Sequence, residues 1–327
     1  MEKVMKRPNL INKRLIIDYN SVIIAIVLIV GSLLFVSGMD KSFYRVILES
    51  SFYGMIALGL SLVMVTGNID LSIGFAAGVA TIVTVAIFNL VYDGSNGFLA
   101  LIISLIAALL CGALTGGING FVVTKIGVSP LIATIATNYI YKGIVFKYAQ
   151  EAFTADGEII KTIAGTKIFG LKWLTPAVLI FAVVVIALIF VMYKTKFGND
   201  VYVVGDNPEA AEYAGISVAK TTWKTYILCG MLGAVTAFFL VSRAGNAMYT
   251  QCSSLDTFSI SACVLGGIKM AGGKGTIVNT VLGIIVMRTI QTIMSTLFLA
   301  TAWVNFVSGA LLIVVLIVDR ITATKEN

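Results

Sequence analysis

The sequence predicts an all-α integral membrane protein with about ten transmembrane helices and with both termini in the cytoplasm. Hydrophobic residues make up 58% of the 327-residue chain and charged residues only 12%, whereas a soluble domain holds about half apolar and a quarter charged residues. Apolar stretches without charge also return along the whole chain. Several of them reach the roughly 20 residues that a helix needs to cross a bilayer.

The spans follow from these stretches in order. Glu49 is the only charge in the second stretch, and Arg45 lies one turn away for pairing. Lys142 and Lys147 can snorkel, which extends a short apolar stretch to about residue 149. The stretch 257–268 is too short for an ordinary span and is expected to be a short or re-entrant helix. The expected spans are 19–39, 46–69, 71–92, 94–124, 126–149, 173–193, 225–242, 257–268, and two within 275–318 that turn at 300–302.

Charge sets the expected orientation. With the N-terminus inside, 14 Lys and Arg residues lie on the inner side and eight on the outer side, as the positive-inside rule requires. The basic segment 1–18 precedes an apolar run without a small-residue cleavage site, so that run is expected to remain as the first helix. The chain then divides into the cytoplasmic segment 1–18, one transmembrane domain over 19–320, and the cytoplasmic tail 321–327.

A short charged insertion lies between two spans at 207–216. Asn207 suits an N-cap and Pro208 the first helical position, while Glu209 and Glu212 lie in the first turn, where the helix dipole favours them. Gly215 supplies a stop. The sequence therefore predicts an isolated helix of about two turns in the cytoplasm, which either docks a partner or merely connects two spans.

Two spans are interrupted by glycine and polar residues. In the first interruption, 67–74, Asp70 and Ser72 can cap the helix that follows. The second, 266–273, aligns with it without gaps if Gly67 is matched to Gly266. Irregular backbone at membrane depth persists only where protein buries it or where it lines water, so both segments are expected to face inwards. The tentative translocation pathway comprises Asn68, Asp70, Ser72, Gly266 and Gly267.

The residue types exclude several chemistries. The chain has no histidine, and its four cysteines show no metal-ligand spacing. Gly273-Lys274 lacks the earlier glycine and the following Ser or Thr of a phosphate-binding loop. We therefore expect no catalytic residue, metal, cofactor or ATP site in this chain. No nucleic-acid partner is expected either, because the basic residues behind the net charge of +7 gather at span ends, where they set orientation. The small residues Ala108, Gly112, Gly116 and Gly120 are spaced for close helix packing, expected within the subunit.

The chain from about 45 to 320 resembles the permease subunits of ribose-type carbohydrate ABC importers. The resemblance rests on several motifs together: Thr66-Gly67-Asn68-Ile69-Asp70-Leu71-Ser72-Ile73-Gly74, Ser129-Pro130-Leu131-Ile132-Ala133-Thr134, Lys196-Phe197-Gly198, Val203-Val204-Gly205-Asp206-Asn207, Glu209-Ala210-Ala211 with Gly215-Ile216, Val264-Leu265-Gly266-Gly267, and Gly272-Gly273 with Gly275-Thr276. Asn68 stands where the family usually has a second glycine, and Gln251-Cys252-Ser253-Ser254 replaces a commonly glycine-rich approach. The latter departure affects the expected outer mouth of the pathway.

The resemblance implies an importer of a small sugar such as ribose, another pentose or a hexose. Its partners would be cytoplasmic ATP-binding subunits, an extracytoplasmic sugar-binding protein, and a second permease copy or homologue, all at the plasma membrane. The segment 207–216 would be the coupling helix, with ATPase contacts from Asn207, Pro208, Glu209, Ala210, Ala211, Gly215 and Ile216. The alternative is an ion-coupled secondary transporter, which needs a titratable group near the midplane. Asp70 and Asp256 are expected near span ends and so disfavour it.

Overall fold

The computed structural model describes residues 39–297 and the single positions 303, 306, 307, 309, 310, 313 and 317. Almost all of the expected span 19–39, the turn at 300–302 and the terminal segments 1–18 and 321–327 lie outside the described residues. The helices are α3 Met39–Val65, α4 Ile73–Val91, α5 Gly97–Phe121 with η1 Val122–Ile126, α6 Pro130–Ala149, η2 Glu158–Lys161, α7 Thr162–Gly165, η3 Ile168–Gly170, α8 Pro176–Lys194, α9 Lys196–Asp206, α10 Pro208–Tyr213, α11 Val218–Ala244, η4 Tyr249–Gln251, α12 Leu255–Leu265 and α13 Ile277–Thr296; the strands are β1 Phe153–Thr154 and β2 Asn246–Ala247.

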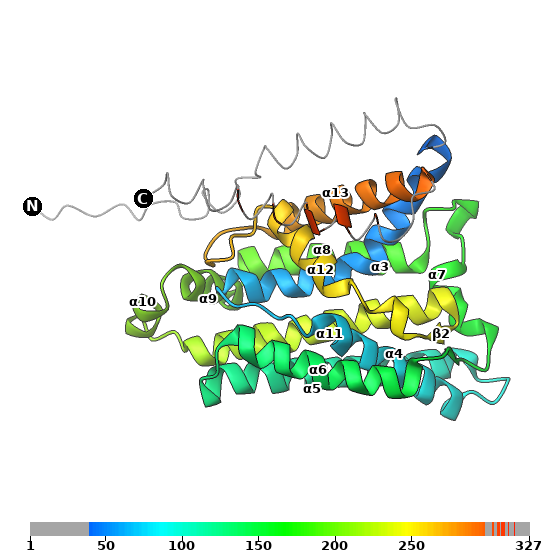
Figure 1. Ribbon diagram of the computed structural model, residues 1–327, viewed down its shortest axis with the longest axis horizontal. Helices are drawn as coiled ribbons and strands as arrows, with labels where there is room; N and C mark the ends of the chain where they lie inside the picture. The colour runs from blue at the N-terminus through cyan, green and yellow to red at the C-terminus, as the bar shows by residue number, and fades with distance from the viewer. Residues whose placement is uncertain are drawn as a thin grey trace, which may run out of the picture.

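The long helices lie side by side in one bundle, with α9 and α10 at one end and α7 and β2 at the other (Figure 1). We call these the α10 end and the α7 end. Among the described residues, six helices are long and apolar enough to cross a membrane, which confirms a helical protein with several candidate spans. They are Phe43–Val65, Ile73–Val91, Gly97–Ile126, Pro176–Lys194, Val218–Ala244 and Ile277–Thr296. The helix expected to reach about residue 149 is α6, Pro130–Ala149.

Glycines bring α5 and α11 into backbone contact. A Cβ atom at Gly112 would collide with the carbonyl of Gly230, and one at Gly116 with the carbonyl of Tyr226. Only glycine permits so close an approach of two helices. The small-residue face expected on this span therefore packs within the subunit, as the sequence predicts.

The α7 end is closed by short elements. β1 pairs antiparallel with β2, which joins the connection after α6 to the segment after α11. Asn89, near the end of α4, donates from its side-chain amide to the carbonyl of Thr154 (3.0 Å). Ser242 accepts the N–H of Ala164 (3.0 Å) and donates to the carbonyl of Ile160 (2.6 Å). These bonds order an irregular connection that has little apolar periodicity of its own.

Two helices of the bundle, α4 and α12, begin inside it and not at its end. After α3 the chain turns back as an extended segment over 66–72, and α4 starts inside the bundle (Figure 1). α12 has 11 residues, about 16 Å at 1.5 Å per residue, and so covers only half of a hydrocarbon core of about 30 Å. The α4 and α12 helices begin beside one another, because a Cβ atom at Gly74 would lie 3.1 Å from the amide nitrogen of Asp256. The expected short helix over 257–268 is thus α12, reached from the α7 end through β2 and the single turn η4.

Candidate functional site

The α10 helix projects from the end of the bundle (Figure 1). Its N-cap is Asn207, whose side-chain oxygen accepts the N–H of Ala210 (3.0 Å), and Pro208 occupies the first turn. Gly215 adopts a left-handed φ of 76°, and the N–H of Ile216 donates to the carbonyl of Ala211 (2.9 Å). This is the end that glycine favours after a helix. The start and stop predicted from the sequence are therefore the ones that the structure uses.

The α10 helix exposes one set of side chains and buries another residue. Pro208, Glu209, Ala210, Glu212 and Tyr213 are exposed, and Tyr213 is 94% exposed. A large aromatic side chain so open to solvent marks a surface suited to a partner. Sequence reasoning left Tyr213 out of the expected contact set, although an aromatic residue on an isolated polar helix was a usable signal.

Ala211 has a different environment from its neighbours on α10. Its side chain is fully buried within the subunit. Ala211 therefore packs α10 against the rest of the subunit, and it is not part of the exposed face of the helix. The expectation that Ala211 belongs to a docking surface overlooked that a two-turn helix must bury one side against its own subunit.

The extended segment 66–72 is held by side chains from the surrounding helices. Tyr226 of α11 donates its hydroxyl to the carbonyl of Ile69 (2.9 Å). Asn138 of α6 donates its amide to the carbonyl of Leu71 (2.6 Å). Asn68 reaches back to the carbonyl of Thr66 (3.0 Å). Because irregular backbone is costly where water is absent, these donors explain how the break is tolerated inside an apolar bundle.

Asp70 lies at the centre of this segment and is only 1% exposed. One carboxylate oxygen accepts both the N–H (2.9 Å) and the hydroxyl (2.7 Å) of Ser72. The amide of Asn119 from α5 lies 3.3 Å from both carboxylate oxygens and donates to the hydroxyl oxygen of Ser72 (2.6 Å). The side-chain oxygen of Asn119 is buried without a hydrogen-bond partner. The hydrogen bonds described for this carboxylate thus come from neutral donors.

Two expectations for this segment need correction. Asp70 does not cap the helix directly: α4 starts at Ile73, Ser72 is at its N-cap without a side-chain cap bond, and Asp70 instead closes a turn onto Ser72. Asp70 lies three residues before the candidate span Ile73–Val91, as expected, but this span begins inside the bundle and not at its end (Figure 1). Asp256 lies in the first turn of the 11-residue α12, which begins beside α4, and charge-free run lengths cannot reveal either position.

The second broken segment ends α12 in the way that the first ends α3. The N–H of Asn68 donates to the carbonyl of Val63 (3.3 Å), and the N–H of Ile268 donates to that of Cys263 (3.0 Å). The left-handed residues are Gly67 and Gly267, with φ of 76° and 84°. Gly67 therefore corresponds to Gly267, and the alignment with Gly266 is wrong by one residue. Matching letters could not tell which of two adjacent glycines takes the positive φ.

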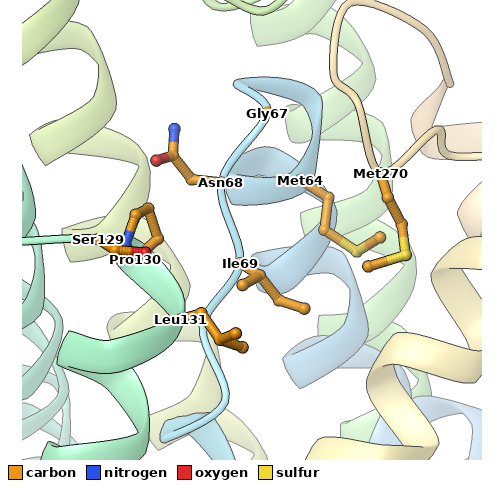
Figure 2. A pocket seen from close by; sticks show the side chains of 8 residues that line it. All are labelled: Met64, Gly67, Asn68, Ile69, Ser129, Pro130, Leu131 and Met270. Carbon is orange, nitrogen blue, oxygen red and sulfur yellow. The ribbon is translucent and has the colours of Figure 1, made fainter.

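A cavity of about 200 Å³ lies at the α10 end, beside the first break (Figure 2). Asn68 is the expected pathway residue that lines it. The lining consists of Met64, Gly67, Asn68, Ile69, Ser129, Pro130, Leu131 and Met270. Asp70 and Ser72 are buried and do not line this cavity. Gly267 forms the turn after α12. Gly266 packs against α13, where a Cβ atom would collide with the carbonyl of Asn279.

The lining combines a few polar groups with apolar side chains. Ser129, Pro130 and Leu131 start α6, and Met270 belongs to the loop between α12 and α13. Ser129, Pro130 and Leu131 were missed as pathway candidates because they are distant in sequence from the breaks, whereas Met270 lies within the second break and was missed because its apolar side chain gave no signal. The motif Ser129-Pro130-Leu131 was a usable signal, since a Ser before Pro and an apolar run predicts a helix start close to a membrane surface.

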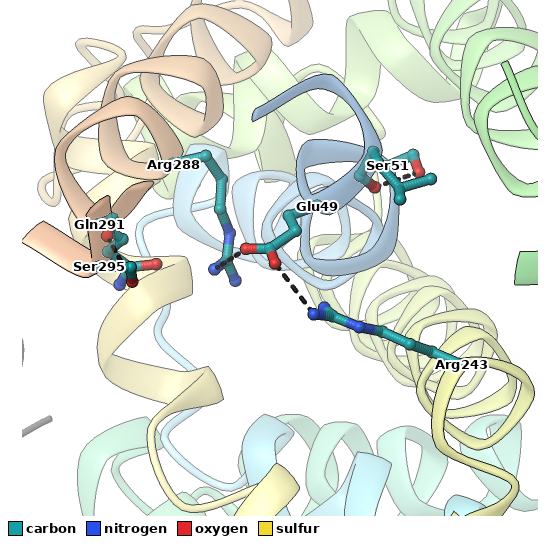
Figure 3. A network of polar contacts seen from close by, with 7 residues as sticks. Glu49, Ser51, Arg243, Arg288, Gln291 and Ser295 are labelled. Carbon is teal, nitrogen blue, oxygen red and sulfur yellow. Dashed lines mark hydrogen bonds and ion pairs between the residues drawn. The ribbon is translucent and has the colours of Figure 1, made fainter. Parts of the chain in front are cut away.

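A charged network lies towards the α7 end (Figure 3). The carboxylate of Glu49 on α3 pairs with Arg243 on α11 (3.0 Å) and with Arg288 on α13 (3.3 Å). The Arg288 guanidinium lies 3.5 Å from the ring centre of Tyr53 and is buried. A flat guanidinium between rings and a carboxylate is a stable way to bury this cation. Glu49 thus pairs across helices, and the expected pairing with the exposed Arg45 one turn away is wrong.

Comparison with known proteins agrees with this architecture. Residues 42–316 match the family model described as branched-chain amino acid transport system / permease component. The chain is 32% identical over 273 residues to the ribose import permease protein of Bacillus subtilis, covering 82% of this chain and 81% of that protein. It is 32% identical to the L-arabinose transport system permease protein of Escherichia coli over 277 residues, 84% and 80% of the two chains.

A third relative is the galactose/methyl galactoside import permease protein of Haemophilus influenzae, 26% identical over 300 residues and 88% of each chain. No solved structure matches significantly. The family match spans both broken helices, the cavity, α10 and the Glu49 network. The chain therefore belongs to the family of branched-chain amino acid transport system permease components.

Proposed function

We propose that this chain is the membrane-spanning permease subunit of an ATP-driven importer of a small sugar. The relatives named for ribose, arabinose and galactose support this substrate class. The observation that carries the proposal is the capped, exposed α10 helix in a bundle that also holds a cavity beside a broken helix. A pentose or hexose would be delivered by an extracytoplasmic sugar-binding protein, and a partner subunit would hydrolyse the ATP.

The α10 helix would be the element on which the ATP-binding subunit acts. Asn207, Pro208, Gly215 and Ile216 would fix its shape through the cap and the terminal turn. Glu209, Ala210, Glu212 and Tyr213 would contact the partner, since they are exposed. Ala211 would hold the helix against its own subunit. A partner groove with basic groups beside an apolar pocket fits this face by charge and shape.

The topology proposed for the membrane has ten crossings. Six are the candidate spans, α6 and the α12 segment add two, and the stretches outside the described residues supply one before α3 and one after α13. Both termini and the α10 end would then face the cytoplasm, with the α7 end outside. A second permease copy or homologue would complete the pathway, as the resemblance to dimeric importers implies.

Reconstitution tests the energy source. The permease, an ATP-binding subunit and a sugar-binding protein are placed in vesicles, and uptake of ribose, arabinose and galactose is measured with and without ATP. We expect uptake only with ATP and the binding protein. Uptake driven by an imposed proton or sodium gradient without the ATPase would instead establish the ion-coupled alternative.

Labelling tests the orientation. A cysteine at Glu212 (Glu212→Cys), in a chain whose native cysteines are replaced by alanine, should resist an impermeant thiol reagent in intact cells and react after the membrane is opened. A cysteine at the exposed Lys167 near α7 (Lys167→Cys) is the matched control and should react in intact cells. The reverse pattern would invert the proposed topology.

A further inference from the structure

Four glycines from three separate segments meet at the α10 end of the bundle. They are Gly67 after α3, Gly205 near the end of α9, and Gly272 and Gly273 in the loop between α12 and α13; we call them the glycine junction. A Cβ atom at Gly205 would collide with the carbonyl of Val65, and one at Gly272 would lie 2.7 Å from the amide nitrogen of Gly67. The three backbones therefore touch without side chains between them.

Hydrogen bonds join the same three segments. The N–H of Gly273 donates to the carbonyl of Val65 (2.9 Å), which ties the loop to the end of α3. The hydroxyl of Tyr202 on α9 donates to the carbonyl of Gly275 (2.8 Å), which ties α9 to the loop. A contact made by backbone atoms has no rotamers through which a displacement could be absorbed.

The glycine junction is continuous with α10. Asn207 is both the C-cap of α9 and the N-cap of α10, so no flexible linker separates the two helices. Asp206, the residue before Asn207, lies against Gly273, because a Cβ atom added to Gly273 would be 2.9 Å from the Cα of Asp206. A displacement of α10 therefore acts directly on α9 and on the loop.

The cavity borders the glycine junction, because Gly67 belongs to both. Met64, Gly67, Asn68 and Ile69 belong to the α3 end, and Met270 belongs to the loop, so these five residues form one wall. Figure 2 shows the facing wall, Ser129, Pro130 and Leu131 at the start of α6. The cavity thus lies between the segments of the glycine junction on one side and the start of α6 on the other.

We propose that the glycine junction makes α9, the end of α3 and the loop 266–276 move as one body with α10, so that displacement of α10 changes the width of the cavity. This inference rests on the proposed coupling role of α10. The junction glycines are positioning residues in this scheme: they link the site of ATPase action to one wall of the pathway. Packed interfaces of this kind switch between discrete arrangements and do not deform continuously.

Spin-label distances in the reconstituted complex test the proposal. In the chain with native cysteines replaced, one pair lies within the moving body (Asp206→Cys with Lys274→Cys), and a second pair spans the cavity (Lys274→Cys with Ser129→Cys). All three positions are exposed. Between the nucleotide-free and vanadate-trapped states, the pair across the cavity should change by about 2 Å or more, while the pair within the body should keep its distance.

Two other outcomes of the distance measurements would contradict the proposal. A change within the body as large as that across the cavity would overturn the rigid link. Two unchanged distances in a complex that hydrolyses ATP and imports sugar would also overturn it. If the ATPase fails to bind the permease at all, the proposed role of α10 falls as well, which separates that failure from failure of the glycine junction alone.

A conservative variant tests whether the link serves transport. Tyr202→Phe removes one hydroxyl from the α9 contact and keeps the ring, so the amount of sugar imported per ATP should fall about two- to tenfold, the factor that one hydrogen bond represents. Tyr141→Phe is the matched control, because its hydroxyl bonds to the carbonyl of Thr115 (3.3 Å), away from the glycine junction. An unchanged ratio in Tyr202→Phe, or an equal fall in both variants, would contradict the proposal.

Discussion

Replacement of Asp70 tests whether its carboxylate serves only to stabilise the structure or whether its negative charge is needed for transport. Asp70 is buried, and its hydrogen bonds come from Ser72 and Asn119, which are neutral donors. A charged carboxylate in a dry interior is costly when neutral groups alone solvate it. We therefore expect that Asp70 acts through hydrogen bonds, and that its negative charge is dispensable.

The structure gives the expected magnitudes. Asp70→Ala leaves the N–H and the hydroxyl of Ser72 without their acceptor in a site that is fully buried. Each unsatisfied buried donor costs about 1–3 kcal/mol, so a loss of about 2–4 kcal/mol is expected, the hydroxyl being able to rotate. Asp70→Asn keeps the acceptor for Ser72. Its new amide can donate to the Asn119 oxygen, which has no partner now, if the Asn119 side-chain amide flips. The flip gives up the Asn119 hydrogen bond to the Ser72 hydroxyl, so one bond replaces another and the expected cost is about 1 kcal/mol.

The assay compares the Asn, Ser and Ala variants of Asp70 at matched membrane levels. Thermal unfolding in detergent reports stability, and ATP-driven sugar uptake reports function. Asp70→Asn should resemble the wild type in both; Asp70→Ser should lie close to it because serine can close the same kind of turn; Asp70→Ala should be less stable. An Asn variant that folds normally but transports as poorly as Ala would refute the reasoning and assign a function to the charge.

Three further predictions concern other parts of the molecule. Glu49→Gln should lower stability by about 3 kcal/mol, because it leaves a buried guanidinium without its carboxylate; Glu158→Gln, in an exposed ion pair, should change thermal unfolding little. Gly116→Ala should prevent folding by separating α5 from α11, whereas Gly117→Ala, with the nearest atom 3.8 Å away, should fold; equal yields of the two would contradict the packing described. Tyr213→Ala should leave unfolding unchanged, since the side chain is 94% exposed, yet weaken co-purification with the ATPase; unimpaired binding would remove Tyr213 from the interface.

The sequence alone determined the features that depend on local chemistry. Long apolar runs predicted the membrane helices, because a spanning helix must be apolar over its length. Asn207, Pro208 and Gly215 predicted the limits of α10, because capping needs only neighbouring residues. Snorkelling lysines predicted the C-terminal end of α6 near residue 149, although the helix begins at Pro130 and not at 126. The motifs that carried the family resemblance indicated a permease of a sugar ABC importer, and the family model together with the ribose, arabinose and galactose permease relatives confirms it.

Only the tertiary structure decided the features that join distant segments. The partner of Glu49 could not be read from the chain, since Arg243 and Arg288 lie on other helices about 200 residues away. Asp70 looked like a residue near a span end, because run lengths do not show that α4 begins inside the bundle. The glycine junction arises where three segments meet through backbone contacts, and the cavity lies between these segments and the start of α6. Such contacts depend on how helices pack, and glycine letters alone mark only that a close approach is possible.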